Sequence, residues 1–334
     1  MRKRTTVGDV ALEAGVSKST VSFVMNKNRP ISKEVTERVM KAVHKLNYSP
    51  NKAAQMLSAK NNRTIGILIE TCNDAFTGVM LEEINQNLLS NKYQMHLAIA
   101  GQGKENAIKA ISNLASGGIV GGIINMLPEL SISETIKYCN SVPTVTYLRP
   151  QVNSPVYLDF ISGIKDAMDY LWGLGHRDIG FIGIEEKSTD LNEDGRLTGF
   201  KQYLTSKNVE IDHNKIVMAP GLFESGISAS ERLYSQGVTA ILCANDQIAT
   251  GVLYWCHENK VDVPSQLSVV GFDDSPIASI VYPALTTVQI PARELAAITV
   301  KGIIDKMNGK IIGQHQVLKP RLIVRKSATR PAIK

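Results

Sequence analysis

The amino-acid sequence predicts an α/β protein in which a small N-terminal helical unit precedes a larger core of two parallel, doubly wound sheets. The length of 334 residues suggests two or three domains, at roughly 100 to 200 residues each. Residues 1–60 contain 12 Lys and Arg but 4 acidic residues, whereas the remainder contains 25 basic and 27 acidic residues. From Thr64 onward, short apolar segments alternate with helical stretches, which is typical of a parallel sheet covered by helices.

The composition argues against several classes of protein. Hydrophobic residues make up 43% and charged residues 20% of the chain, so disordered and collagenous classes do not fit. There is no uncharged apolar run of about 18 residues, and the basic start leads into polar residues instead of the apolar core of a secretion signal. We therefore expect a cytoplasmic protein. The cysteines form no C-x-x-C, so neither a disulfide framework nor a zinc site is predicted: they are Cys72, Cys139, Cys243 and Cys256.

The first predicted helix begins after Thr6. Thr6 and Asp9 have the spacing of a capping box, and Gly15 is placed to end the helix. Between them runs an apolar stripe with helical spacing, formed by Val7, Val10, Ala11 and Ala14.

A second helix follows after a short turn, with Ser17 as its N-cap. Its apolar face is formed by Val21, Val24 and Met25, and its opposite, polar face by Lys18, Ser19, Ser22 and Asn26. Two short helices joined through residues 14–17 are typical of a helix-turn-helix.

A third helix is predicted after the loop at residues 26–30. Ser32 caps it, Asn47 and Pro50 close it, and its apolar positions are Val35, Val39, Ala42, Val43 and Leu46. Three such helices can bury one another's stripes, which leaves the polar face of the second helix free to enter a DNA major groove. The excess positive charge supports nucleic-acid binding, because Lys and Arg gain by replacing counterions on phosphates. The alternative is a charged end that only keeps the protein soluble.

This segment resembles the headpiece of the LacI/GalR (lactose-repressor/galactose-repressor) family of bacterial transcription regulators. The resemblance rests on many residues at fixed spacing, namely Asp9-Val10-Ala11, Ala14-Gly15-Val16-Ser17, Thr20-Val21-Ser22, Asn26 and Leu46-Asn47-Tyr48-Ser49-Pro50-Asn51. It implies that Lys18, Ser19 and Ser22 face base edges or nearby phosphates. It also implies that Thr6, Tyr48 and Asn51 contact the DNA backbone. Thr20, Phe23 and Asn26 complete the DNA contacts that the resemblance implies.

Phe23 departs from the family pattern, because many members have a base-reading Arg at this position. A phenyl ring can touch a thymine methyl group but cannot form the bidentate hydrogen bonds that Arg makes to guanine. We therefore predict a base other than guanine, or a weakly specified base, opposite Phe23. The alternative is that Phe23 packs against the protein core.

Residues 51–60 are too few to form a stable helix alone in water. In the family this stretch is a hinge that becomes helical on operator DNA, pairs with its twin in the minor groove and inserts a leucine between base pairs. The resemblance places Leu57 at the inserting position and Ala54 where the two helices approach each other. Such a wedge kinks the duplex, and the enlarged contact offsets the cost of unstacking. The alternative is a solvated linker in which Met56 and Leu57 only cover the next domain.

Strands of the core are predicted over residues 64–69, 95–100, 122–125, 144–147, 179–184, 240–244 and 267–272. Segments 175–183, 244–246, 268–274 and 285–288 resemble the core of the same family, which is built like a periplasmic sugar-binding protein. The resemblance implies two Rossmann-like subdomains with a ligand cleft between them. This agrees with the rule that ligands lie at the carboxyl ends of parallel strands.

The predicted organisation is a helix-turn-helix headpiece at residues 1–50, a hinge helix or linker at 51–60 and an effector-binding and dimerisation core at 61–334. Within the core, the first subdomain comprises about 61–161 and 290–318, and the second about 162–289 and 319–334.

Side chains at the family's effector positions suit a hydroxylated ring, since polar groups grip hydroxyls while aromatic rings cover the apolar face. They are Asn73, Phe76, Arg149, Asp159, Phe160, Arg196, Phe223, Asn245 and Asp273. Each has a structural alternative: Asn245 or Asp246 only caps a helix, Asp273 binds only backbone, or Arg196 pairs with Asp194 or Glu193. Asp74-Ala75 replaces the family's usual Pro-Phe, and Leu148 stands where an acid is common, so the sugar is not identified.

An enzymatic function is not predicted. The phosphate-loop candidate Gly101-Gln102-Gly103-Lys104 has Asn106 where the dinucleotide fingerprint requires its third glycine. The sequence has neither a G-x-S-x-G elbow nor an H-E-x-x-H motif, and its 6 histidines show no metal-ligand spacing. We expect no catalysis, no cofactor and no metal.

The sequence thus predicts a sequence-specific transcriptional repressor that binds a palindromic operator as a homodimer. A sugar or sugar derivative in the core cleft would reorient the subdomains and so favour or disfavour the hinge pair. A dimer is expected over a tail-bundled tetramer, because no apolar heptads follow the last predicted strand at residues 322–325. The alternative is a sugar-binding module without operator function; an exported protein of that class would not explain the basic headpiece.

Overall fold

The computed structural model describes residues 5–26, 29–46, 48, 62–127, 129–146, 154–185, 195–311, 313 and 315–332. The chain divides into two units, residues 1–60 and 61–334. Helices and parallel sheets confirm the predicted α/β class.

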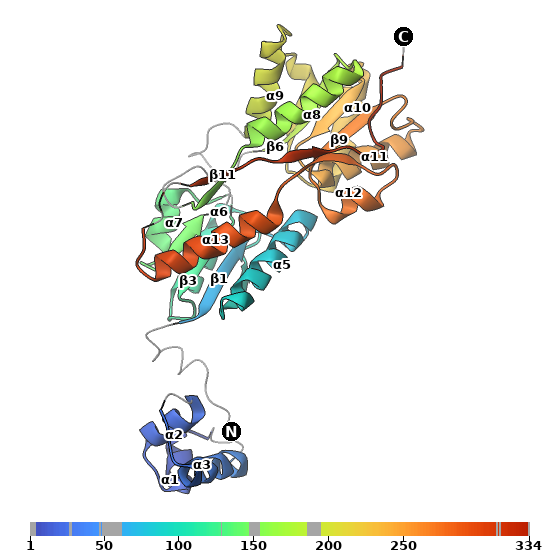
Figure 1. Ribbon diagram of the computed structural model, residues 1–334. Helices are drawn as coiled ribbons and strands as arrows, with labels where there is room; N and C mark the ends of the chain where they lie inside the picture. Colours follow the sequence, from blue (N-terminus) through green and yellow to red (C-terminus); the bar gives the residue numbers. More distant parts are fainter. Residues whose placement is uncertain are drawn as a thin grey trace. The chain divides into compact units, whose positions relative to one another are not determined.

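The N-terminal unit contains the three predicted helices, α1 (Val7–Ala14), α2 (Lys18–Asn26) and α3 (Lys33–Lys45) (Figure 1). The capping box at the start of α1 is confirmed: Thr6 N donates to Asp9 Oδ2 at 2.7 Å, and Asp9 N donates to Thr6 Oγ1 at 3.3 Å. Gly15 ends the helix in the left-handed region, at φ 61°, which glycine adopts without steric cost. The buried side chains come from all three helices: Val10, Ala11, Ala14, Val21, Val24, Val39 and Ala42.

Arg38 of α3 fixes the turn between α1 and α2. Its Nη2 donates to the carbonyl oxygens of Ala14 at 2.7 Å and Gly15 at 3.2 Å. These carbonyl groups have no acceptor role within the helix, so a cation at this end is favourable. The contact therefore holds α2 in a defined orientation on the other two helices.

The first sheet of the core has the order β2-β1-β3-β4, and its strands are parallel. They are β1 (Thr64–Ile69), β2 (Gln94–Ile99), β3 (Gly122–Asn125) and β4 (Thr144–Thr146). Side chains of β1 alternate between the two faces: Ile65 and Ile67 belong to one buried cluster, and Leu68 belongs to the other. The first face is covered by α5 (Ala75–Ser90) and α13 (Ala292–Met307), the second by α6 (Lys104–Ala115) and α7 (Ile132–Tyr138).

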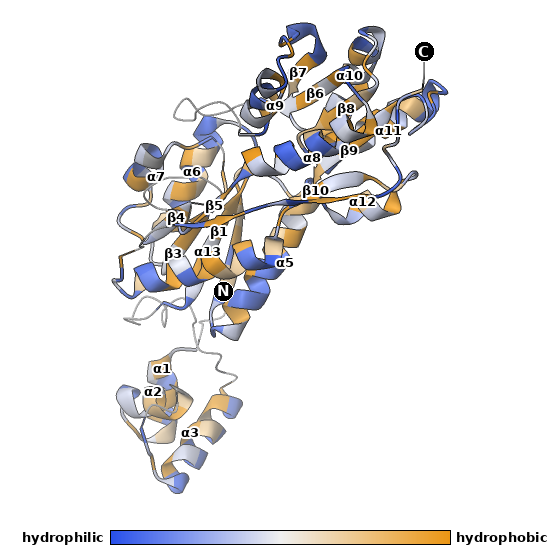
Figure 2. Ribbon diagram, turned by 45° about the horizontal axis from the view of Figure 1, so that its top comes forward, coloured by the Kyte–Doolittle hydropathy of each residue, from blue (hydrophilic) through white to orange (hydrophobic). Residues whose placement is uncertain are grey.

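The second sheet has the order β12-β10-β9-β8-β6-β7, in which β12 is antiparallel to β10 and the other pairs are parallel. Its strands are β6 (Ile179–Ile184), β7 (Ile216–Ala219), β8 (Ala240–Cys243), β9 (Ser268–Asp273), β10 (Thr286–Gln289) and β12 (Arg321–Ile323). Figure 2 shows that the central strands β1 and β3 are mainly hydrophobic, and both are buried along their whole length. This is expected of parallel strands that are buried on both faces.

Helices cover the second sheet in two pairs. α8 (Phe160–Leu174) packs with α9 (Gly195–Ser206), and α10 (Phe223–Ser235) packs with α11 (Asp246–Glu258). The second pair is in very close contact, because a Cβ atom on Gly226 would lie 2.0 Å from the carbonyl oxygen of Ile248. The 3-10 turn His213–Lys215 precedes β7, and the short α12 (Pro276–Ile280) follows β9.

The chain crosses between the two sheets three times, at the end of β5 (Val156–Leu158), after β10 and after β11 (Gln316–Leu318). β5 and β11 pair in parallel, and Asp159 N donates to Leu318 O at 2.9 Å, so the first and third crossovers lie together. The second crossover joins Gln289 to α13.

Strand positions agree with the sequence analysis where the apolar run is long. The strands at 64–69, 122–125 and 179–184 were predicted at their observed bounds, whereas β2 and β9 are each displaced by one residue. The short strands β5, β7, β10 and β11 were missed, and β12 begins one residue before the predicted 322–325. Within the described ranges, no helix combines the length and apolarity needed to cross a membrane.

Candidate functional site

The N-terminus of α2 carries a network of hydroxyl groups. Ser17 Oγ accepts from Thr20 N at 3.1 Å and lies 2.7 Å from Ser19 Oγ and 2.8 Å from Thr20 Oγ1. Ser17 is therefore the N-cap that the sequence predicted, and it holds two of the predicted DNA-contacting hydroxyls at a helix N-terminus. Exposed backbone N–H groups and hydroxyls at such a terminus suit a phosphate group.

Lys18 and Ser22 lie on the polar face of the same helix, and both side chains are exposed. The Lys18 side chain passes close to α1: a Cβ atom added to Gly8 would lie 3.2 Å from Lys18 Cε. The absence of a side chain on Gly8 thus leaves room for the Lys18 stem beside Thr6.

Phe23 is half-buried and contacts a cation. The guanidinium carbon of Arg29 lies 5.2 Å from the centre of the Phe23 ring, which is a cation–π distance. Phe23 is absent from the described side chains that pack on the headpiece core. Arg29, which sequence reasoning missed, therefore stands beside the position where Phe23 replaces a base-reading Arg.

The other residues that were predicted to contact DNA are described by the structure to different extents. The Thr6 hydroxyl belongs to the α1 capping box, where it donates to Asp9 Oδ2 at 2.8 Å. Tyr48 is half-buried, packs on the headpiece core, and its backbone N donates to Val43 O at 2.9 Å. Asn26 is the last residue of α2. The Asn26 side chain lies outside the described part of the structure, and so do Asn51, Ala54 and Leu57.

In the core, the guanidinium group of Arg196 lies beside two neighbouring aromatic rings. Its guanidinium carbon is 5.1 Å from the ring centre of Phe160 and 5.8 Å from that of Phe272, and these rings are 5.8 Å apart. Its Nη1 donates to the carbonyl oxygen of Ala244 at 2.7 Å. Three elements, α8, α9 and β9, thus bring together an aromatic surface and a fixed cation. Phe272 is fully buried in β9, and its contact with Arg196 had not been predicted from the sequence.

The predicted residues at helix starts act as caps. Asn245 Oδ1 accepts from Ile248 N at 2.8 Å and its Nδ2 donates to Gly221 O at 2.9 Å, so Asn245 caps α11. Asp159 caps α8 by accepting from Ser162 N at 3.0 Å. Such caps fix the orientation of the helix ends around the site.

Phe76 and Asp273 line one cavity of about 470 Å³ at the crossovers. Phe76 is in the first turn of α5, and Asp273 is the buried last residue of β9, in the left-handed region at φ 107°. The cavity is also lined by Val79, Asp274, Gln289, Ile290, Pro291, Ala292, Arg293, Glu294, Leu318, Lys319 and Arg321. This volume is within the range of small-molecule sites.

The other predicted effector residues that the structure describes do not line this cavity. Asn73 is exposed in the loop before α5, and its carbonyl accepts from Gln247 Nε2 of α11 at 3.4 Å. The Phe223 ring contacts Tyr254 of α11, with centres 5.5 Å apart. Arg149 is outside the described residues.

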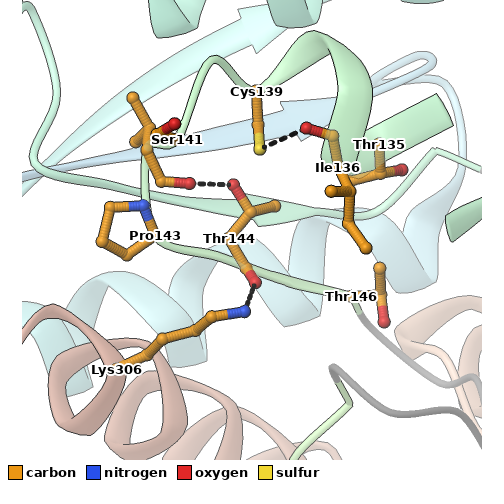
Figure 3. Close-up of a pocket in the computed structure, with 9 residues that line it drawn as sticks. Thr135, Ile136, Cys139, Ser141, Pro143, Thr144, Thr146 and Lys306 are labelled. Carbon is orange, nitrogen blue, oxygen red and sulfur yellow. Dashed lines mark hydrogen bonds between the residues drawn. The ribbon is translucent and has the colours of Figure 1, made fainter. Parts of the chain in front are cut away.

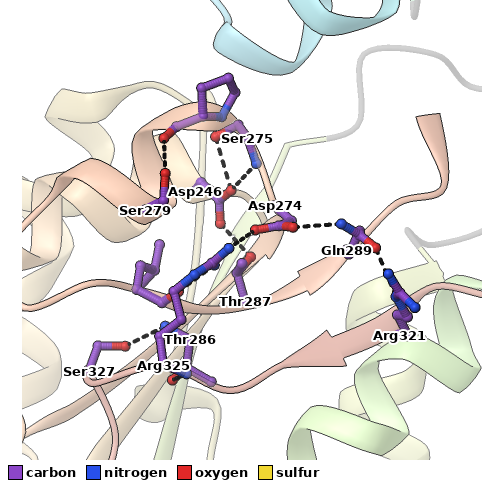
Figure 4. A network of polar contacts seen from close by, with 12 residues as sticks. Asp246, Asp274, Ser275, Ser279, Thr286, Thr287, Gln289, Arg321, Arg325 and Ser327 are labelled. Carbon is purple, nitrogen blue, oxygen red and sulfur yellow. Dashed lines mark hydrogen bonds and ion pairs between the residues drawn. The ribbon is translucent and has the colours of Figure 1, made fainter. Parts of the chain in front are cut away.

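Asp246, which follows the Asn245 cap, is buried beneath the end of β9 (Figure 4). Its Oδ2 accepts from Ser275 N at 2.7 Å and Ser275 Oγ at 3.0 Å, and its Oδ1 accepts from Thr287 Oγ1 at 2.5 Å. Burial raises the pKa of Asp246 to about 7, although these hydrogen bonds favour the charged form.

A second cavity, of about 420 Å³, lies beside β4 between α7 and α13. Lys306 Nζ donates to the Thr144 carbonyl oxygen at 2.7 Å (Figure 3), and burial lowers the pKa of Lys306. None of the predicted effector residues within the described ranges lines this cavity. In the described part of the chain, no group of three His, Cys, Asp or Glu side chains is arranged to hold a metal ion.

Two family models match the chain. The model described as bacterial regulatory proteins, lacI family, matches residues 6–51, and that of a periplasmic binding protein-like domain matches residues 168–328. The ribose operon repressor of Haemophilus influenzae is 30% identical over 329 residues, which cover 96% of this chain and 98% of that protein. Catabolite control protein A of Priestia megaterium is 28% identical over 334 residues, covering 97% and 99%. The crystal structure of the lac repressor dimer bound to operator and the anti-inducer ONPF superposes with a TM-score of 0.84 at 27% identity, covering 98% of this chain and 100% of that chain.

Proposed function

Because this chain belongs to the lacI family of bacterial regulatory proteins, whose members here are DNA-binding transcriptional regulators, we propose that it is a homodimeric repressor of a palindromic operator under the control of a sugar or sugar derivative. The proposal keeps the domain division expected from the sequence, with a headpiece at residues 1–50, a hinge at 51–60 and an effector-binding core at 61–334. Its function requires no catalysis and no cofactor, and it acts in the cytoplasm, where DNA is available.

Operator recognition by α2 is supported most directly by the polar face of that helix. Lys18 and Ser22 are exposed there, hydroxyl groups gather at its N-terminus, and Phe23 pairs with Arg29 instead of joining the headpiece core. A helix with this arrangement can place cations on phosphates while short polar side chains reach base edges.

Effector binding in the core is supported by two neighbouring features. Arg196 lies beside the neighbouring rings of Phe160 and Phe272, and Asp273, directly after Phe272, lines the cavity of about 470 Å³. A cation and a carboxylate can bind hydroxyl groups, while an aromatic ring covers the apolar face of a sugar. The related ribose operon repressor and the ONPF complex of lac repressor support a sugar-like ligand.

Homodimer formation is supported by exposed apolar side chains of the core. Ile280, the last residue of α12, and Tyr282, which follows the helix, are 78% and 95% exposed, and Tyr254 of neighbouring α11 is also exposed. Because α11 and α12 contact each other, these side chains can contribute to one apolar surface, which is typical of a protein interface. Two-fold symmetry would then present two headpieces to two half-sites.

The experiment that tests this function is selection from a random duplex library by the purified full-length protein at a stated salt concentration. It is run with and without a panel of mono- and disaccharides that includes D-ribose. The expected result is a palindrome whose enrichment changes with one sugar. A palindrome that appears only with sugar indicates co-repression, and one that disappears indicates induction. No enrichment under any condition returns support to a sugar-binding module without operator function.

The Arg196→Ala variant separates the two halves of the proposal. Removing the guanidinium should abolish the response to sugar and leave the operator sequence and affinity unchanged, because Arg196 lies in the core. A variant that still responds normally would remove Arg196 from the effector site.

A further inference from the structure

We propose that Gln289 is a positioning residue that connects the ligand-facing end of β9 to two of the three crossovers between the sheets. The inference rests on the proposed function, because it describes how occupancy of the core would be transmitted. It assigns a role to three side chains, Asp274, Gln289 and Arg321, that the predicted effector set does not contain.

The position of Gln289 in the sheet makes this connection possible. It is the last residue of β10 and lies between two neighbours in register, Asp273 of β9 and Arg321 of β12. The chain leaves the second sheet directly after Gln289 and returns to it directly before Arg321. Gln289 and Arg321 therefore stand at the two points where the chain passes to and from the first sheet.

Side-chain hydrogen bonds join these points into one relay (Figure 4). Arg321 Nε donates to Gln289 Oε1 at 2.8 Å, and Gln289 Nε2 donates to Asp274 Oδ2 at 2.7 Å. The amide of Gln289 has one acceptor and one donor group, and each is directed to a different partner. Only a side chain with both can connect a cation on one side to a carboxylate on the other.

Asp274 is held firmly at its end of the relay. Its Oδ1 accepts from Arg325 Nη2 at 2.6 Å, and the Arg325 side chain is also tied to Leu285 O at 2.9 Å. This ion pair is largely buried, with 21% and 11% of the two side chains exposed. The relay thus ends on a fixed group.

The turn that Asp274 occupies has an unfavourable backbone. Asp273 and Asp274 both have positive φ, 107° and 55°, in a region that side chains other than glycine rarely adopt. Such a conformation persists only where surrounding contacts determine it. The contacts of Asp274 with Gln289 and Arg325 contribute to that constraint on the turn that also contains Asp273.

The relay also forms part of the wall of the candidate effector cavity. Asp274, Gln289 and Arg321 line the same space of about 470 Å³ as Phe76 and Asp273. A ligand that moves Asp273 would therefore act on a turn that is connected to both crossovers. Conversely, a change in the crossovers would alter the turn that presents Asp273, as thermodynamic linkage requires.

Hydrogen–deuterium exchange on the full-length protein tests the relay without a ligand. The reporters are the amides of Ser275, which donates to Asp246 Oδ2 at 2.7 Å, and Ile290, which donates to Asp273 O at 3.3 Å. In Arg321→Ala, exchange at Ser275 should rise by about fivefold or more, as expected when a hydrogen bond is lost from a local opening equilibrium. Among the residues that the structure describes, Arg321 makes no hydrogen bond to that turn, so a purely local role would leave exchange at Ser275 unchanged.

Two further variants complete the test. Gln289→Ala should raise exchange at Ser275 and Ile290, and adding Arg321→Ala to it should cause no further rise at Ser275. Lys319→Ala is the matched control, because Lys319 is exposed, lines the same cavity and belongs to the same crossover as Arg321 but takes no part in the relay. Urea unfolding of each variant shows that the comparison is made between folded proteins.

The proposal is overturned if the Arg321→Ala effect stays within residues 318–323, if it persists unchanged in the Gln289→Ala background, or if Lys319→Ala has the same effect at Ser275. Failure of the proposed function is a separate result. A duplex selection without enrichment would remove operator control and leave the exchange data readable. Conversely, a sugar-responsive operator with exchange changes confined to the mutated crossover would remove the relay alone.

Discussion

Replacing Phe23 with Arg should create a preference for guanine at the base pair facing this position. Arg forms bidentate hydrogen bonds to the O6 and N7 atoms of guanine, which the phenyl ring cannot form. The Phe23 side chain is half-buried and does not belong to the buried headpiece cluster, so the substitution should not remove core packing. The change therefore tests whether this position of α2 faces the bases.

The magnitude follows from two opposing interactions. A bidentate contact discriminates between bases by about 1–3 kcal/mol, or roughly 5- to 150-fold in affinity. The introduced guanidinium would lie near Arg29, whose guanidinium carbon is 5.2 Å from the present ring centre. Two cations about 5 Å apart in water repel by roughly 0.8 kcal/mol. That repulsion is common to all duplexes, so it weakens binding overall without changing the ratio between bases.

The assay is fluorescence anisotropy with duplexes that differ only in the base pair assigned to Phe23 by selection. Phe23→Leu is the control, because it stays apolar and should gain no preference for guanine. The reasoning is refuted if Phe23→Arg keeps the base preference of the unmodified protein across all four duplexes. A loss of folding would be recognised separately by thermal unfolding of the variant.

Three other predictions concern the hinge, the headpiece and the core. Leu57→Ala should reduce operator bending and affinity while leaving sugar affinity intact, and unchanged bending in a circular-permutation gel assay would contradict the wedge. Arg38→Ala should destabilise the headpiece by about 1–2 kcal/mol in urea unfolding, because the carbonyl groups that end α1 lose a cationic donor, whereas Lys41→Ala should not. Asp246 has a folded pKa of about 7, above its unfolded value of about 3.9, so its contribution to stability falls as pH rises between these values, by up to about 1.4 kcal/mol per pH unit. Asp246→Asn should remove this pH dependence. The difference in free energy of unfolding between the unmodified protein and the variant should therefore become smaller from pH 5 to pH 8. A difference that stays constant would show that Asp246 does not titrate in this range.

Local signals in the sequence were sufficient for the headpiece. The capping box of Thr6 and Asp9, the terminal Gly15 and the Ser17 cap all act within a few residues of one another, so they can be recognised without the fold. The strand at 179–184 was also predicted at its observed bounds from a local signal, since its apolar run is long and continuous. The three-residue strands β5 and β11 carry too few residues for a periodic pattern.

Contacts that depend on tertiary structure could not be predicted. The Arg196 cluster joins residues from three elements, and Phe272 is indistinguishable in sequence from any other buried strand residue. Likewise, Gln289 contacts Arg321 only because β12 runs antiparallel to β10 at the edge of the sheet. The pairing of Arg29 with Phe23 depends on the path of the loop after α2, for which the sequence offers no periodic signal.

Sequence-specific operator binding is the central claim, and a titration of the selected palindrome tests it most directly. Full-length protein is titrated at one fixed salt concentration against the palindromic duplex, a duplex with one half-site scrambled and a fully scrambled duplex of equal length. The account predicts that the palindrome binds at least about 1,000-fold more tightly than the fully scrambled duplex, with the single half-site between them. Equal affinity for all three duplexes would show that the basic headpiece binds DNA through charge alone, and it would contradict the account.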